Sequence, residues 1–344
     1  MHSGKFILKQ ADIKQKIFMS KLENSKIYIA GHRGLVGSAI TRRLQAEGYS
    51  HLLTRTHAQL DLLDQRAVND FFEKEKPEYV FLAAAKVGGI GANSTYPADF
   101  IYQNTMIGFN VVHNAYKYGV KKLINLGSSC IYPKMAPQPM KEKYLLSDYL
   151  EPTNEAYAVA KISVIKLCTF YNQQYGTNFL SVMPTNLYGP GDNYDPDGSH
   201  VLPALIRKFH EAKVSGTDHV TLWGDGSPRR EFLYSDDLAE ALIMLMQNNN
   251  ACNLSNPAGD FVNVGCGKDL TIKELAEIIL SVVYEEAPNR TCHIEWDASK
   301  PNGTPQKLLD ISRITALGFS PKTDFTEGIK LAYKDFVNNY GQQK

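Results

Sequence analysis

The chain has 344 residues, a formal net charge of +1 and charged residues spread along its length. That length can bury one large core or two modest ones, and the balanced charge argues against nucleic acid or an anionic membrane as a partner. The five cysteines are odd in number and lack CxxC spacing, which argues against a disulfide framework or a metal site and favours a cytoplasmic protein.

The first 25 residues alternate charged side chains with isolated apolar ones and lack the continuous apolar stretch of a secretory signal. We expect residues 1–25 to be a disordered leader or a remnant of cloning, because the first convincing strand begins only at Lys26. Later apolar runs are too short to span a bilayer. A small molecule is therefore the expected partner.

From Lys26 onward, short apolar runs rich in β-formers alternate with helical patterns. The expected strands are 26–30, 51–54, 78–85, 122–129 and 179–185, and the expected helices are 35–48, 66–76, 97–119 and 155–175. This alternation predicts a parallel sheet with helices on both faces. The expected fold class is α/β, with a Rossmann-type doubly wound sheet and a smaller mixed α/β lobe.

Regular alternation ends at about Asn186. We expect a cofactor-binding Rossmann domain over 26–185 and a substrate-binding lobe over 186–340, with segments near 232–240 and 261–266 returning to the first domain. The proline-rich stretch 134–155 cannot be regular helix or central strand throughout, so it is expected to be an active-site loop.

The first turn, GHRGLVG, lies between a strand and a helix. Its glycines would expose backbone N–H groups to a pyrophosphate at the helix N-terminus, although a glycine-rich turn can also bind nothing. Its position between strand and helix favours a dinucleotide site. The expected contacts are Gly31, His32, Arg33, Gly34, Leu35, Val36 and Gly37.

Two arginines favour NADP over NAD as the cofactor. Arg33 lies in the glycine turn, Arg55 follows the second expected strand, and no acidic residue that could bond a ribose 2′-hydroxyl comes before Asp61. Either arginine alone could be a surface charge, but together they would converge on one 2′-phosphate. Asp61 and Leu62 could border the adenine, or Asp61 could simply favour a helix start.

Ser128 in GSSCIY, and Tyr157 and Lys161 in YAVAK, indicate ketone reduction by a nicotinamide enzyme. Residues at i and i+4 share a helix face, so Lys161 would favour the ionised Tyr157 phenol. Ser128 would hold a substrate oxygen while Tyr157 protonates it. The alternative is a helix with a surface lysine.

These motifs resemble those of the extended short-chain dehydrogenase/reductases and, more narrowly, of the GDP-L-fucose synthase family. The likeness runs from about residue 26 to 340 through GHRGLVGSAI, AAAKVGGI, NSTYPADFIYQN, GSSCIYP, EPTNEAYAVAK, VMPTNLYGP and KPNGTPQKLLD. It implies an enzyme that inverts C3 and C5 of GDP-4-keto-6-deoxy-D-mannose and reduces the C4 ketone with NADPH. The alternatives are another nucleotide-sugar 4-epimerase or 4-reductase, or a catalytically silent NADP-sensing protein.

The resemblance also implies roles for single residues. Cys130 would be the base of the inversions and His200 the acid, whereas their ordinary roles would be a small buried hydrophobe and a loop histidine. The cofactor site would extend to His57, Ala84, Leu126, Gly127, Ser128, Ser129, Lys161, Pro184, Thr185, Asn186, Leu187 and His200. His57 falls where some relatives carry an arginine.

The second lobe is expected to hold the GDP portion of the substrate. By resemblance, Arg230 would contact the diphosphate, and Lys208 and Trp223 would line the nucleotide site, although both could equally be surface or core residues. Asn302 stands where relatives commonly carry an aspartate. The aromatic and apolar residues of helices 97–119 and 155–175 imply a homodimer through a four-helix interface.

Overall fold

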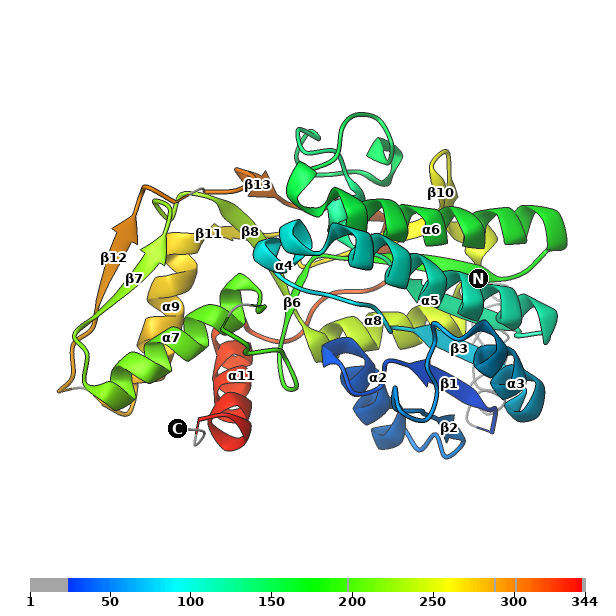
Figure 1. The fold of residues 1–344 in the computed structure, drawn as a ribbon, viewed down its shortest axis with the longest axis horizontal. Coiled ribbons are helices and arrows are strands. Elements are labelled where there is room, and N and C mark those ends of the chain that lie inside the picture. Colours follow the sequence, from blue (N-terminus) through cyan, green and yellow to red (C-terminus); the bar gives the residue numbers. More distant parts are fainter. Residues whose placement is uncertain (1–23, 197, 288, 301, 342–344) are drawn as a thin grey trace, which may run out of the picture.

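The computed structural model describes residues 24–196, 198–287, 289–300 and 302–341 of the chain. Figure 1 shows two parts: a large sheet layered with helices, and a smaller lobe that carries the C-terminal helix. Residues 1–23 of the leader expected over 1–25 lie outside the described residues. Among the described helices, none is long and apolar enough to cross a membrane.

The larger part is built on a seven-stranded sheet with the order β2-β1-β3-β4-β5-β10-β9. The strands, in that order, are Leu52–Leu53, Ile27–Ala30, Tyr79–Leu82, Lys122–Leu126, Phe179–Pro184, Gly259–Val264 and Ser255–Asn256. The pairs from β2 through β10 are parallel, and β9 is antiparallel to β10. The expected α/β class is confirmed.

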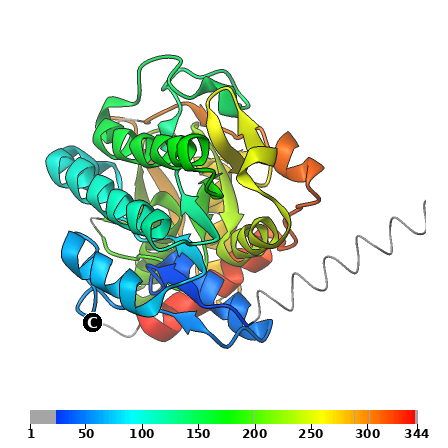
Figure 2. The same cartoon turned by 90° about the vertical axis from the view of Figure 1, so that its right-hand side faces the viewer.

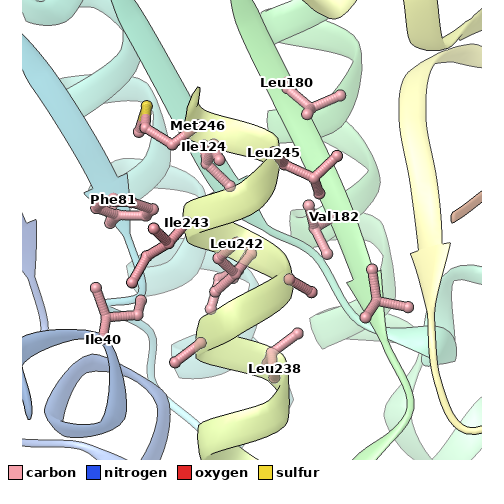
Figure 3. Packing of buried hydrophobic residues seen from close by; sticks show 14 of the residues in the cluster. Ile40, Phe81, Ile124, Leu180, Val182, Leu238, Leu242, Ile243, Leu245 and Met246 are labelled. Carbon is pink, nitrogen blue, oxygen red and sulfur yellow. The ribbon is translucent and has the colours of Figure 1, made fainter. Parts of the chain in front are cut away.

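Helices α2 (Leu35–Ala46) and α8 (Ser235–Asn248) cover one face of this sheet. Figure 3 shows apolar side chains of α8, such as Leu242 and Ile243, among those of strands β3, β4 and β5, and all of them are buried. Burying one such side chain contributes roughly 1.5–3 kcal/mol to stability. This contact therefore anchors α8 to the sheet.

Helices α3 (Gln65–Glu75), α5 (Pro97–Lys117) and α6 (Glu155–Tyr175) cover the opposite face, and the short α4 (Ile90–Thr95) precedes α5. The Asp64 side chain caps the first N–H groups of α3, and Gly176, left-handed at φ 66°, ends α6. Figure 2 shows α5 and α6 side by side. Gly108 permits this approach, because a Cβ there would lie 2.2 Å from a methyl carbon of Val164.

The smaller lobe contains two short sheets. One is formed by β11 (Asp269–Thr271), β8 (Arg229–Tyr234), β13 (Gln306–Lys307) and β6 (Asn186–Tyr188), and the other by the parallel pair β7 (His219–Trp223) and β12 (His293–Asp297). Helices α7 (Val201–Ser215), α9 (Ile272–Tyr284) and α11 (Phe325–Asn339) pack around a core that includes Phe209, Ile279 and Phe336.

Short elements lie in the connecting segments. Helix α10 (Ser312–Ala316) packs with the larger part, and the 3-10 helices are η1 (Ser129–Ile131), η2 (Glu142–Tyr144), η3 (Pro152–Asn154) and η4 (Ala251–Leu254). Residues 134–155, expected to be a loop, contain no helix longer than η2 and η3 before α6 begins.

The chain leaves the large sheet after β5 and returns to it after β8. Residues 235–264 supply α8 and β10, which overlap the two segments expected to return, 232–240 and 261–266. Strand β6, which begins at Asn186, already pairs with β8. The assignment of cofactor binding to 26–185 and of substrate binding to 186–340 stays a prediction.

Candidate active site

The candidate site lies where the segments after β1, β3, β4 and β5 meet. Strand β1 has β2 on one side and β3 on the other, so the chain order reverses there, and parallel sheets bind ligands at such a point. Gly31 follows β1 with φ 83°, and a Cβ on it would lie 2.7 Å from the backbone nitrogen of Ala84. The glycine turn therefore lies directly against the segment after β3, which contains Ala84. The contact of Ala84 with the cofactor stays a prediction.

The glycine turn fits a dinucleotide pyrophosphate. A Cβ on Gly37 would lie 2.1 Å from the Gly31 oxygen, so the turn closes tightly on the first turn of α2. Gly34 caps α2 without a side-chain hydrogen bond, and the first turn contains no acidic residue. Leu35 and Val36 open the helix, so their backbone N–H groups are available to an anion. His32 adds a buried Nδ1 atom without a partner among the described residues.

The two arginines expected at a 2′-phosphate have different surroundings. Arg33 is exposed and has no hydrogen-bond or ion-pair partner among the described residues. Arg55 donates to Glu75 at 2.7 Å and to the Thr54 oxygen, and its guanidinium lies 5.4 Å from the centre of the Phe71 ring. Arg55 therefore already has a carboxylate partner on α3.

Three neighbouring residues were expected to border the cofactor. The His57 ring lies 3.7 Å from the Asp61 carboxylate, and Asp61 accepts a hydrogen bond from the Leu63 N–H at 2.9 Å. Leu62 is buried in the core beside α3 and α5. Asp61 and His57 thus lie at the surface of this edge, whereas Leu62 packs beneath them.

The three residues of the expected reductase set lie at the end of β4 and on α6. Lys161 donates a hydrogen bond to the Leu126 oxygen at 2.8 Å, and its Nζ atom lies 5.6 Å from the centre of the Tyr157 ring. Ser128 caps η1, where its Oγ atom accepts from the Cys130 N–H at 3.4 Å. The Tyr157 ring meets the edge of Phe100, with ring centroids 6.2 Å apart.

Burial has the largest effect on the pKa values of Tyr157 and Lys161. Burial raises the pKa of Tyr157, and a negative charge on Cys130 raises it further. Burial lowers the pKa of Lys161 to about 8, although Cys130 opposes that change. The expected lowering of the phenol pKa by Lys161 is not seen, because burial of Tyr157 is the largest influence on that pKa and raises it. Tyr157 therefore remains a protonated donor at neutral pH.

Cys130 and His200 share Lys307 as an electrostatic neighbour. Burial raises the pKa of Cys130, while a hydrogen bond with Ser128 and the ammonium groups of Lys307 and Lys161 lower it. His200 precedes α7 and is exposed, although neighbouring protein atoms still remove part of its water, and this desolvation together with Lys307 lowers its pKa. Lys307 therefore interacts electrostatically with both the thiol and the imidazole, and the action of these two residues on one substrate stays a prediction.

Lys307 was missed by the sequence analysis. It lies in the segment KPNGTPQKLLD, which carried part of the resemblance, but only Asn302 of that segment was singled out. It stands opposite Arg230 in the pairing of β13 with β8, which joins segments far apart in the chain.

The remaining expected cofactor residues lie at the ends of β4 and β5. Gly127 donates to the Val182 oxygen at 2.8 Å, and Ser129 begins η1. Strand β5 ends at Pro184. The Thr185 hydroxyl and the Asn186 side-chain amide then both donate to the backbone oxygen of Glu231. Leu187 pairs with Leu233 of β8. These contacts connect the end of β5, in the large sheet, to β8 at the border of the site.

The expected substrate residues lie on α7, β7, β8 and the segment before β13. Trp223 ends β7 with its side chain 67% exposed, and Lys208 donates to the Thr221 oxygen of the same strand at 3.3 Å. A Cβ on Gly303 would lie 3.5 Å from an Arg230 nitrogen. The Asn302 oxygen accepts from the Asp225 N–H at 2.9 Å, so Asn302 holds the turn after Trp223.

A cavity elsewhere in the described residues does not coincide with this site. A cavity of about 730 Å³ lies in the smaller lobe, lined by residues of α7 and α11 such as His210 and Tyr333, and no candidate residue lines it. No group of three or more His, Cys, Asp or Glu side chains in the described part of the chain is arranged to hold a metal ion.

Comparisons with known proteins identify the family. Residues 27–265 match the NAD dependent epimerase/dehydratase family. GDP-L-fucose synthase 1 of Arabidopsis thaliana is 54% identical over 92% of this chain and 94% of its own length. GDP-L-fucose synthase of Escherichia coli is 52% identical over 92% of this chain and 98% of its own length.

A solved structure is similar in both sequence and fold. A GDP-mannoheptose C4 reductase from Campylobacter jejuni, with NADP bound, is 41% identical and has a TM-score of 0.83, covering 91% of this chain and 98% of that one. The matches confirm the resemblance found in the sequence. The chain belongs to the NAD-dependent epimerase/dehydratase family and, within it, to the GDP-L-fucose synthases.

Proposed function

We propose that this chain makes GDP-L-fucose from GDP-4-keto-6-deoxy-D-mannose, by inverting C3 and C5 and then reducing the C4 ketone. One observation carries the proposal: Ser128, Tyr157 and Lys161 lie at the same site as Cys130. A reductase needs only the first three, whereas an additional thiol supplies a base. The names of the relatives at 54% and 52% identity support the same reaction.

NADP(H) is the proposed cofactor. The glycine turn and the open first turn of α2 would hold the pyrophosphate. The Arg33 guanidinium, which has no partner in the described part of the chain, would meet the 2′-phosphate. The NADP bound to the similar reductase agrees with this choice. NADPH, when bound, supplies the hydride that reduces C4.

The first step needs a base and an acid on the sugar. A C4 carbonyl makes the hydrogens on C3 and C5 acidic, so the Cys130 thiolate takes a proton from one of these carbons and the electrons move to the C4 oxygen. Ser128 and Tyr157 would donate hydrogen bonds to that oxygen and stabilise its charge. His200 then returns a proton to the carbon from the opposite face, which inverts it.

The second step uses the same oxygen. When C4 is reduced, its oxygen gains negative charge and accepts the Tyr157 proton. The raised pKa of the phenol keeps that proton in place until it is needed. Lys161, with its ammonium over the ring, then stabilises the phenolate.

The smaller lobe would hold the nucleotide. Arg230 would pair with the diphosphate, since a guanidinium matches phosphate oxygens with two parallel hydrogen bonds. The exposed Trp223 indole offers a flat surface for the base, and Lys208 adds positive charge beside it. Asn302 would contribute indirectly, because its side chain holds the turn that follows Trp223.

A 4-reductase that leaves C3 and C5 unchanged is the second candidate, because the similar Campylobacter jejuni structure is a C4 reductase. Both candidates would consume NADPH with a 4-keto sugar nucleotide. They differ in product: comparison of the product with authentic GDP-L-fucose by chromatography separates them. GDP-L-fucose supports the proposal, and a product with unchanged C3 and C5 overturns it.

A homodimer formed by α5 and α6 is the proposed assembly. These helices expose large apolar side chains that have no role in the core, including Tyr102 at 61%, Phe170 at 57% and Phe109 at 37% exposure. The same two helices from a second copy would cover this surface in an isologous interface.

A further inference from the structure

His200 is carried by the smaller lobe, whereas Ser128 and Cys130 lie in the larger part. His200 is the N-cap residue of α7, and Phe209 of the same helix lies in the core of the smaller lobe. Ser128 and Cys130 follow β4 of the seven-stranded sheet. The position of the imidazole relative to these two residues therefore depends on contacts between the two parts.

One such contact joins the backbone before His200 to the segment that follows β3. The Gly89 N–H donates to the Gly198 oxygen at 3.1 Å. A Cβ on Gly89 would lie 3.0 Å from the Ser199 oxygen, so the two backbones approach closely because residue 89 has no side chain. The Gly198 N–H also donates to the Asp195 carboxylate at 2.9 Å. The backbone that leads into His200 is thus held against the larger part.

The Asn93 side chain holds the other partner of this contact. From α4, its amide donates to the Gly88 oxygen at 2.8 Å and to the Gly89 oxygen at 3.0 Å. Asn93 is only 7% exposed, and its buried Oδ1 atom has no hydrogen-bond partner among the described residues. The side chain therefore acts on the Gly88–Gly89 turn through its amide N–H groups.

We propose that Asn93 is a positioning residue for His200, because it fixes the Gly88–Gly89 turn and Gly89 fixes the backbone that leads into His200. The inference rests on the proposed function for the role of His200 as the acid of the inversions. In that step an imidazolium N–H bond breaks, the electrons of the enolate form the new C–H bond, and the C4 carbonyl is restored. Asn93 neither gains nor loses a proton and acts only through His200.

The backbone determines where the imidazole lies. The His200 side chain is exposed and forms no capping hydrogen bond with α7. A proton donor must be placed on the correct face of the sugar, and a displacement of about 1 Å can lower a rate about a hundredfold. A shift of the Ser199 backbone would therefore move the acid away from the carbon it protonates.

The first test observes His200 directly and uses no substrate. The protein is made with isotope-enriched histidine, and the ring NMR signal of His200 is assigned by its loss in His200→Ala. Asn93→Leu removes the amide donors at similar side-chain volume, and Gly89→Ala places a methyl group against the Ser199 oxygen. Both variants are expected to shift or broaden the His200 signal. Thermal unfolding checks that each is folded, and Gly89→Ala decides the result if Asn93→Leu does not fold.

Asn256→Leu is the matched control, because the Asn256 amide also donates to two backbone oxygens, those of Gly259 and Phe261. These contacts lie where β10 begins, at the opposite end of the sheet from Pro184, which ends β5 beside the candidate site. The control is expected to leave the His200 signal unchanged.

The second test is a double-mutant cycle with His200→Ala. When His200 is present, Asn93→Leu is expected to slow the appearance of solvent deuterium at C3 and C5 about tenfold or more. In the His200→Ala background the further loss is expected to be less than about twofold, because a residue that acts only through His200 then has nothing to position. A merely structural role would slow both backgrounds equally.

An unchanged His200 signal in Asn93→Leu and Gly89→Ala overturns the proposal, and so does an equal loss of deuterium incorporation in the two backgrounds. Normal deuterium incorporation in His200→Ala itself would instead refute the role of His200 in the proposed function. In that case the ring signal still decides whether Asn93 positions His200.

Discussion

The Lys161 ammonium lies over the face of the Tyr157 ring, 5.6 Å from its centre, while the phenol itself is buried. Tyr157 is therefore a neutral proton donor beside the Lys161 cation, and not an ionised phenolate. Such an arrangement favours the transfer of a proton out of the phenol, because the charge left behind is stabilised by Lys161.

Tyr157→Phe is expected to lower the rate of NADPH oxidation about a hundredfold or more, because it removes the proton donor to the C4 oxygen. Exchange of the C3 and C5 hydrogens with solvent is expected to continue, since Cys130 and Ser128 remain. NADPH absorbance and deuterium incorporation measure the two steps separately. Near-normal reduction in this variant would rule out the assigned role.

The rate of reduction is expected to fall as pH rises through about 8. Burial lowers the pKa of Lys161 to about 8, so its ammonium is present below that pH and is lost above it. Each further pH unit should reduce the charged fraction, and with it the rate, about tenfold. In Lys161→Arg this decline should disappear, because a guanidinium stays charged. A parent profile that is flat well above pH 8 would contradict the assignment.

Arg33→Met is expected to reduce the preference for NADPH over NADH roughly tenfold or more, because it removes a guanidinium that has no partner among the described residues. Arg55→Met is expected to have a smaller effect, since Arg55 is paired with Glu75. The ratio of Michaelis constants for the two cofactors measures this. Arg42→Met, which breaks a surface pair with Asp236 and a hydrogen bond to Ser38, is the control. A larger loss with Arg55→Met would reverse the assignment.

Much of the fold follows from local patterns in the sequence. Helix α6 spans the predicted 155–175 because the segment contains no proline or glycine and is followed by the left-handed Gly176, and β1 appears within the predicted 26–30. Contacts between distant segments could not be predicted in the same way. The Arg55–Glu75 pair and the register of Lys307 with Arg230 depend on how elements pack. The pKa of Tyr157 changed in the unexpected direction for the same reason: burial is a property of the folded chain.

Phe170→Glu is expected to convert the dimer to a monomer. The substitution would place two like charges and their desolvation cost in an isologous interface, and sedimentation velocity measures the result. Leu331→Glu is the control, because Leu331 is also exposed, at 47%, but lies on α11. A parent that sediments as a monomer, or a Phe170→Glu variant that remains a dimer, would refute the interface.

The central claim is that one site performs both the inversions and the reduction. Its most direct test is incubation of the protein with GDP-4-keto-6-deoxy-D-mannose and NADPH in deuterated water, with the product analysed by NMR. GDP-L-fucose carrying solvent deuterium at C3 and C5 is expected from the parent, and no deuterium at either carbon from Cys130→Ala. A reduced product with its original C3 and C5 hydrogens, or deuterium incorporation that persists without the thiol, would contradict the claim.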